Sequence, residues 1–146
     1  MAGSSDVAGG NAIRATLWNG ATATDLGTLG GAYSFANAIN DAGQVVGYAQ
    51  TTDNAVYHAT LWSGATAPDL NSFLDASTVS AGWVLENATG INDQGWIVGN
   101  ASNAQLGITS HAFLLSTTPV PELDTATMML SGLVLTGFVM RRRKPV

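Results

Sequence analysis

Two histidines occupy corresponding places in a repeated sequence, and histidine can bind metals or transfer protons near neutral pH. His58 and His111 each begin an apolar run, His58-Ala59-Thr60-Leu61-Trp62 and His111-Ala112-Phe113-Leu114-Leu115. The chain has no cysteine, and no Cys/His cluster surrounds either histidine, as a zinc site would require. We therefore interpret both as framework residues that pack and hydrogen-bond within a repeat, and we predict no metal site.

Two Asn-Asp pairs, Asn40-Asp41 and Asn92-Asp93, offer the amide and carboxylate oxygens that Ca²⁺ prefers. A calcium loop usually alternates several acidic ligands over a longer stretch, whereas each pair here stands alone. Each pair is followed two residues later by glycine. Because Asn and Asp side chains close local turns and glycine permits positive φ, the pairs predict turns rather than calcium sites.

The tryptophans Trp18 and Trp62 also stand at equivalent positions, and an exposed indole could stack on a sugar ring. Such residues more often fill the interface between repeats. Asp75, Glu86 and Glu122 form no recognisable pair for glycoside hydrolysis. No nucleophile elbow, phosphate-binding loop or dinucleotide fingerprint is present. We predict no catalytic residues, no enzymatic activity and no cofactor.

Charge is sparse and unevenly placed along the 146 residues. Charged side chains make up only 10% of the chain, and the net charge is −5. Residues 1–125 hold all ten carboxylates, whereas four of the five basic residues are Arg141, Arg142, Arg143 and Lys144. An acidic body without a basic patch cannot neutralise phosphates, which excludes nucleic acid as a partner.

The elements that must position these residues are marked by a repeated motif, Ile-Asn-Asp-x-Gly-x-[Val/Ile]-Val-Gly. It occupies residues 39–47 and returns at 91–99, a shift of 52 positions between Asn40 and Asn92. Strand-like apolar runs flank the Asn-Asp turn, so each copy predicts a β-hairpin.

Each motif contains two glycines with different expected roles. Gly43 and Gly95 close the turns, where positive φ is expected. Gly47 and Gly99 fall in or just after the second strand, where a bulge or close packing is expected.

A second block repeats out of phase with the hairpins. Ala15–Leu26 matches Ala59–Leu70 with a shift of 44 positions between Trp18 and Trp62, and a partial third copy starts at His111. We divide residues 1–115 into units at about 14–57 and 58–110 and a partial unit from 111. Each complete unit offers about four strands, and periods of about 40–50 residues suggest propeller blades or a stacked array.

The predicted fold class is an all-β repeat, with incomplete propeller-like blades of short antiparallel strands, followed by a single C-terminal transmembrane helix. One four-stranded unit cannot cover both of its own faces, so neighbours must pack on it. Residues 3–13 resemble the end of an earlier unit. We therefore expect an N-terminally truncated chain or a protomer that depends on assembly.

The composition changes after Leu115. Residues 116–121 predict an extended Pro/Thr linker, and residues 122–143 predict the only substantial helix. Its fifteen uncharged residues, Ala126 to Met140, would span about 22 Å against a bilayer core of about 30 Å. The four following cations would stay cytoplasmic and leave the repeats outside. The alternative is a buried C-terminal helix of a soluble domain.

This tail resembles the PEP-CTERM sorting signal, which combines a Val-Pro-Glu-Pro motif, a transmembrane helix and a basic end. Val120, Pro121 and Glu122 carry the motif, and Leu123 stands where the pattern has its second proline. The resemblance implies export, transient anchoring in the inner membrane and recognition by an exosortase-type enzyme. We expect Leu123 to slow that processing.

The body resembles the HAF repeat family, named for a His-Ala-Phe motif. His111-Ala112-Phe113-Leu114 carries the motif intact, and the run from His58 to Trp62 carries it nearly so. The segment Asp25–Gly31 and the two hairpin motifs also match. The resemblance implies an extracellular protein without an established activity.

These observations favour a non-enzymatic, exported β-repeat protein of the bacterial surface or extracellular matrix, sorted or anchored by its C-terminal signal. Exopolysaccharide is a further candidate partner. One alternative is a glycan-binding or enzymatic propeller, with its site on missing blades or in the insertion at residues 71–87. A second is a non-functional gene remnant. The first seven residues do not resemble a signal peptide, so the export route stays open.

Overall fold

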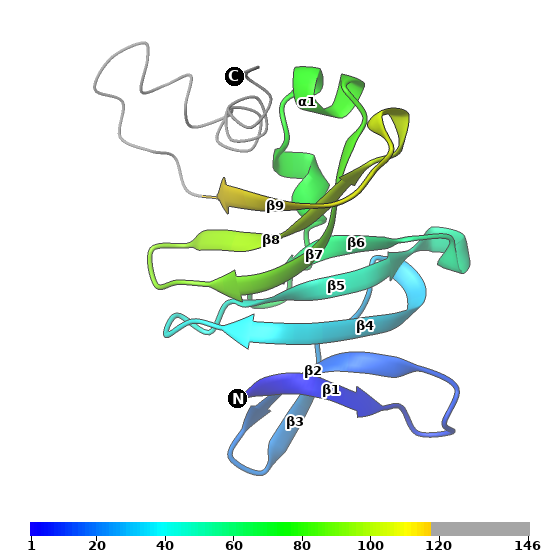
Figure 1. Ribbon diagram of the computed structural model, residues 1–146. Coiled ribbons are helices and arrows are strands. Elements are labelled where there is room, and N and C mark those ends of the chain that lie inside the picture. Colours follow the sequence, from blue (N-terminus) through cyan, green and yellow to red (C-terminus); the bar gives the residue numbers. More distant parts are fainter. Residues whose placement is uncertain (118–146) are drawn as a thin grey trace.

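The computed structural model describes residues 1–117, and the regular structure of this body is mostly β, as predicted (Figure 1). Nine strands form three antiparallel sheets of three, each in chain order. The first sheet contains β1 (Ala2–Asp6), β2 (Ile13–Asn19) and β3 (Thr22–Asp25). The second contains β4 (Gly30–Ile39), β5 (Val45–Thr51) and β6 (Tyr57–Trp62), and the third contains β7 (Trp83–Ile91), β8 (Trp96–Asn103) and β9 (Ile108–Ser116).

The helices of the described region are short. Three are 3₁₀ turns, η1 (Thr52–Asn54), η2 (Leu70–Phe73) and η3 (Ala104–Leu106), and one is the α-helix α1 (Ala76–Ser80). The insertion of the second repeat forms η2 and α1 before it enters β7. Both elements start at aspartate, since the Asp69 side chain accepts a hydrogen bond from Asn71 N and the Asp75 side chain accepts one from Thr78 N.

Both predicted hairpins are confirmed. The turn of the β4–β5 hairpin is closed by Gly43 N, which donates to Asn40 O at 3.0 Å, and Gly95 N donates to Asn92 O at 3.1 Å in β7–β8. Gly43 has φ +78° and Gly95 has φ +81°. The left-handed conformation explains why glycine recurs at these two positions.

The sheets combine strands from neighbouring sequence units. The second sheet takes β4 and β5 from the unit at 14–57 and β6 from the next one. The expected fourth strand, the run into Asp-Leu, forms β3 in the first sheet but is reduced to the isolated bridges Thr60↔Asp69 and Ser63↔Thr66 in the second. The expectation of about four strands is therefore confirmed for the unit at 14–57, which holds β2, β3, β4 and β5, but it is wrong for the unit at 58–110, which keeps β6, β7 and β8 and lacks the strand at the Asp-Leu run. Pro68 offers no N–H to a ladder, and η2 begins at Leu70.

The sheets stack in chain order, with the first at the bottom of the view in Figure 1 and the third at the top. Strand β4 packs against β1 and β2, and β7 packs against β4, β5 and β6. Two apolar cores result. Ala15, Val45, Ala49 and Trp62 form the core between the first and second sheets. Val46, Ala59, Leu61, Leu70, Trp83, Leu85, Ala88, Ile97, Ala101, Phe113 and Leu115 form the core that joins the second and third sheets.

Several sequence predictions lie outside residues 1–117. They are the helix at 122–143, the sorting motif Val120, Pro121 and Glu122, the anchor Ala126 to Met140, and the basic end Arg141, Arg142, Arg143 and Lys144. Among residues 1–117, no helix has the length and apolar character needed to span a membrane.

Candidate functional site

A cleft with aromatic and polar walls lies at the junction of the second and third sheets. Its volume is about 350 Å³, and it is lined by Tyr48, Val56, Tyr57, Glu86 and Asn87. The lining residues come from β5, β7, the start of β6 and the residue before it. We take this cleft as the candidate site because it combines two aromatic rings, the exposed Tyr57 and the half-buried Tyr48, with hydrogen-bonding groups.

The two rings of the aromatic wall, Tyr48 and Tyr57, belong to a cluster of three rings on three neighbouring strands. Phe35 and Tyr48 are cross-strand partners, and their rings stack with centroids 4.9 Å apart and an interplanar angle of 23°. Tyr57 meets the edge of Tyr48 at 5.4 Å and 74°. Tyr57 is 36% exposed and Val56 is 51% exposed. The cluster therefore presents apolar surface to solvent while its own packing holds the rings in place.

The polar wall comes from a bulge in β7. The pairing register between β7 and β8 shifts between Leu85 and Asn87, so Glu86 is an extra residue. Consecutive side chains of a regular strand point to opposite faces, and a bulge can bring two of them to the same side. Glu86 and Asn87 both line the cleft for this reason.

Glu86 and Asn87 each use one side-chain atom in a hydrogen bond within the protein and keep a second polar atom that could bond to a ligand. A Glu86 oxygen accepts a hydrogen bond from Ser102 Oγ at 2.7 Å, and Asn87 Oδ1 accepts one from Asn37 Nδ2 at 2.7 Å. Within residues 1–117, the second Glu86 oxygen and the Asn87 amide nitrogen have no hydrogen-bond partner. Rings that can stack on C–H groups, beside one acceptor and one donor, suit a polyhydroxylated ligand such as a sugar.

Trp62 does not supply a sugar-stacking surface, because it is only 1% exposed and packs in the core between the first and second sheets. This location agrees with the interpretation for Trp62, whereas Trp18 is only partly buried and belongs to neither core. The cleft itself was not predicted. Its one sequence signal is a departure from the repeat, since Tyr48 stands where the second hairpin has Asn100.

His58 belongs to a hydrogen-bonded network that joins β6 to β7. His58 Nδ1 lies 2.5 Å from Asp69 Oδ2, and the other Asp69 oxygen accepts from Asn71 N and Nδ2 at 2.8 and 2.9 Å. The Asn71 amide then donates to Leu85 O at 2.9 Å and accepts from Leu85 N at 2.7 Å. The network places His58 in the framework of the repeat.

The pKa values of this pair are displaced in opposite directions. The hydrogen bond to Asp69 raises the pKa of His58 above its ordinary value against the opposing effect of burial, and the charges of Asp69 and Glu86 add to the rise. Burial by itself would raise the pKa of Asp69. The hydrogen bonds from His58 and Asn71 together outweigh burial, so the pKa of Asp69 lies below its ordinary value.

The first sheet has a pair of a basic and an acidic residue at the place that is equivalent to His58 and Asp69. Arg14 Nη1 lies 3.8 Å from Asp25 Oδ2, where the second unit has His58 and Asp69. In the third sheet, the His111 ring packs on Trp83 with centroids 5.6 Å apart, and its Nε2 is buried without a hydrogen-bond partner among residues 1–117. The position thus carries a different pairing in each sheet.

We expect the His58–Asp69 pair to make stability depend on pH. Protonated His58 stabilises the folded state, and this contribution is complete below about pH 6.5, the pKa of histidine in the unfolded chain. The contribution is lost as the pH rises through the higher pKa that His58 has in the folded state. Ionised Asp69 also stabilises the folded state. This contribution is complete above the ordinary pKa of aspartate and is lost as the pH falls through the lowered pKa of Asp69. Urea titrations at about pH 5.5 and 8.5 should show a loss on the order of 1 kcal/mol for the natural chain. The variant His58→Asn should lack this loss, and an equal loss in both proteins would contradict the assignment.

The Asn-Asp pairs do more than close turns, because they join the two hairpins. Asn40 Nδ2 donates to Asn92 O at 3.0 Å, and Asp41 N donates to Asp93 Oδ1 at 2.8 Å. Asn37 Nδ2 donates to Ala88 O at 2.8 Å as well as to Asn87. In the part of the chain that the structure describes, no group of three His, Asp or Glu side chains could hold a metal ion.

Comparison with known proteins yields no match to a protein-family model, a curated protein or a solved structure.

Proposed function

We propose that the chain is a non-enzymatic β-repeat protein of the bacterial cell envelope, exported and held at the inner membrane by its C-terminal segment. Its repeats would lie outside the cytoplasm and serve as a structural element of the cell surface or extracellular matrix. In this proposal the sheets are incomplete propeller-like blades, and the PEP-CTERM-like tail delivers the protein to an exosortase-type enzyme.

The bonding between the two hairpins is the observation that carries the structural role. The residues that define the motif, Asn40 and Asp93 above all, are used to bind one repeat to the next. Other repeat positions fill the two cores or brace a strand, as His58 does. A chain whose recurring residues join neighbouring repeats is organised as a stack, and repeat stacks serve mainly as extended surfaces.

The location follows from the resemblance of residues 120–144 to a sorting signal, and a reporter fusion tests it. Residues 116–146 would be placed behind an exported reporter in a host with and without an exosortase. We expect cleavage at the Pro121-Glu122 motif only in the host with the enzyme, and membrane retention without it. A matched fusion with Pro121→Ala and Glu122→Ala should stay uncleaved in both hosts.

Two results would change this proposal. Membrane retention without cleavage in both hosts would leave a plain anchor and remove the exosortase as a partner. A soluble reporter in the host that lacks the enzyme would show that residues 126–140 do not anchor the protein, and the proposed location would be wrong.

Glycan binding is a second candidate function, favoured by the cleft between the second and third sheets. Its ring cluster and its free Glu86 oxygen suit the C–H faces and hydroxyls of an exopolysaccharide. Titration of the full chain with oligosaccharides from bacterial exopolysaccharides should detect binding that Tyr57→Ala weakens at least about tenfold. The control Tyr33→Ala changes a tyrosine that does not line the cleft. Equal binding by both variants, or none by the natural chain, would exclude this function.

A further inference from the structure

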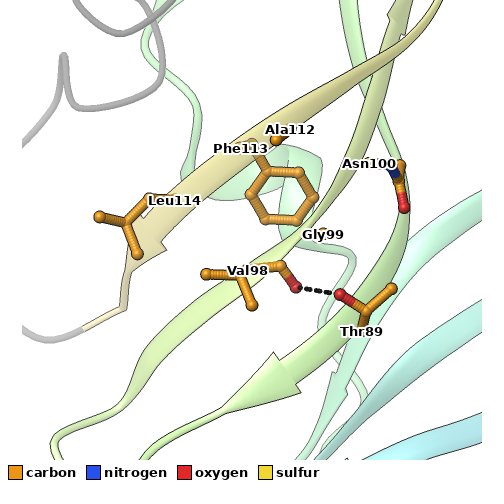
Figure 2. A pocket seen from close by; sticks show the side chains of 7 residues that line it. All are labelled: Thr89, Val98, Gly99, Asn100, Ala112, Phe113 and Leu114. Atoms are coloured by element: carbon orange, nitrogen blue, oxygen red, sulfur yellow. Dashed lines mark hydrogen bonds between the residues drawn. The ribbon is translucent and has the colours of Figure 1, made fainter.

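An apolar groove is lined by residues of β8 and β9 in the third sheet, with Thr89 of β7 (Figure 2). Its exposed residues lie on the face of the sheet opposite to the core residues Ile97 and Leu115, and this face points away from the second sheet. Its volume is about 430 Å³. Val98 of β8 and Leu114 of β9 are cross-strand partners in it, and they are 45% and 36% exposed. Ala112 and the ring of Phe113 also line it.

The repeat shows what this face does in the other two sheets. Val98, Ala112 and Leu114 correspond to Val46, Ala59 and Leu61 in the second sheet, and to Ala2, Ala15 and Leu17 in the first. In the second sheet these residues are covered by the third sheet, and Val46 and Ala59 are both 0% exposed. In the first sheet, Ala15 is 0% exposed under the second sheet. The groove is therefore the third copy of a face that is otherwise covered by a neighbouring sheet.

The contact between the first and second sheets also shows which residues cover this face. Trp62 of the second sheet packs into the core with Ala15, and Leu17 and Ala67 pack against that core. The counterparts of Trp62 and Ala67 in the first sheet are Trp18 and Ala23. No sheet within residues 1–117 covers them, so Trp18 is only partly buried and Ala23 is exposed. The third sheet thus exposes one side of the interface that joins the first and second sheets, and the first sheet exposes the other side.

We propose that the groove binds the first sheet of a second copy of this chain, with Trp18 of one copy packed against Val98 and Leu114 of the other. This contact joins unlike faces, so it propagates into an open stack or closes into a ring. Two copies would bring together six sheets, since residues 1–117 of each copy form three. That number lies within the roughly four to eight blades of known propellers. The inference does not depend on the C-terminal anchor.

Disulfide trapping tests the contact directly, because the chain contains no cysteine. Ala23→Cys and Ala112→Cys change exposed alanines whose counterparts, Ala67 and Ala15, belong to the same core. The two full-length variants would be mixed in dodecyl maltoside under mild oxidation. We expect a disulfide-linked dimer in the mixture only. Ala76→Cys changes an exposed alanine of α1 and serves as the control. Mixed with either of the two variants, it should give no dimer.

Other occupants of the groove would give different products. A dimer of Ala112→Cys alone would mean that two grooves face each other, which overturns the head-to-tail arrangement. An intrachain disulfide between Ala112→Cys and Met129→Cys would mean that the chain's own C-terminal segment fills the groove. A mixture with no more dimer than the control would mean that no second copy binds there.

Sedimentation velocity supplies a second measurement that needs no cysteine. Val98→Asp places a charge in the groove at an exposed position and should weaken self-association at least about tenfold. Val79→Asp is the matched control, because Val79 is 53% exposed, lies in α1 and does not line the groove. Association that Val98→Asp leaves unchanged would overturn the proposal.

Discussion

Replacement of Gly99 by alanine should destabilise the protein by at least about 3 kcal/mol, which is the upper range for overpacked positions. A Cβ at Gly99 would overlap the carbonyl oxygen of Asn87, and it would lie 2.7 Å from a ring carbon of Phe113 and 2.9 Å from Ala88 Cα. Backbone atoms of a paired strand cannot move aside without breaking its ladder. Gly47 stands at the equivalent place, where a Cβ would overlap the Phe35 carbonyl oxygen.

Gly43→Ala is the matched control for this prediction. Gly43 has φ +78° but open space around its Cβ position. Its replacement should therefore cost only the strain of a left-handed residue, about 1–2 kcal/mol. Urea unfolding followed by circular dichroism would measure both variants. Similar losses for Gly99→Ala and Gly43→Ala would contradict the close approach of the strands at Gly99.

Removal of the Trp62 side chain should cost about 3–5 kcal/mol, the range measured for large aromatic residues in cores. Trp62 is 1% exposed between the first and second sheets, where it packs with Ala15 and Val45. Its loss would leave a cavity in the smaller of the two cores and loosen the first sheet from the second.

The repeat offers a control of the same residue type for Trp62→Ala. Trp18 stands at the equivalent position of the first sheet but is only partly buried. Trp18→Ala should cost no more than about 1.5 kcal/mol when unfolding is measured at low protein concentration. Equal losses for the two variants would mean that the second sheet does not cover the first through Trp62.

The hairpins could be predicted because their signal is local. Nine residues contain both the turn chemistry, from Asn40 to Gly43, and the apolar strands that the turn connects. The grouping of strands into sheets could not be predicted in the same way. The pairing of β6 with β5 crosses a boundary between sequence units, and Pro68 removes a strand that the repeat implies.

The candidate site could not be predicted because its parts are brought together by packing between sheets. Tyr48 and Tyr57 belong to the second sheet, whereas Glu86 and Asn87 belong to the third. Their shared cleft also depends on a bulge in β7, which no single residue in the sequence marks. The His58–Asp69 pair could not be predicted either, because Asp69 lies eleven residues after His58, beyond a loop.

Every strand in the three sheets pairs only with a strand that is adjacent in the sequence. The chain therefore needs no late segment to complete an early sheet, and short-range pairings of this kind favour rapid folding. If the protein crosses a membrane from its N-terminus onward, each sheet can close as soon as its third strand emerges and then act as a template for the next. Synthesis and folding would thus proceed in the same direction, and in an unfinished chain only the latest sheet would still await a neighbour from the same chain.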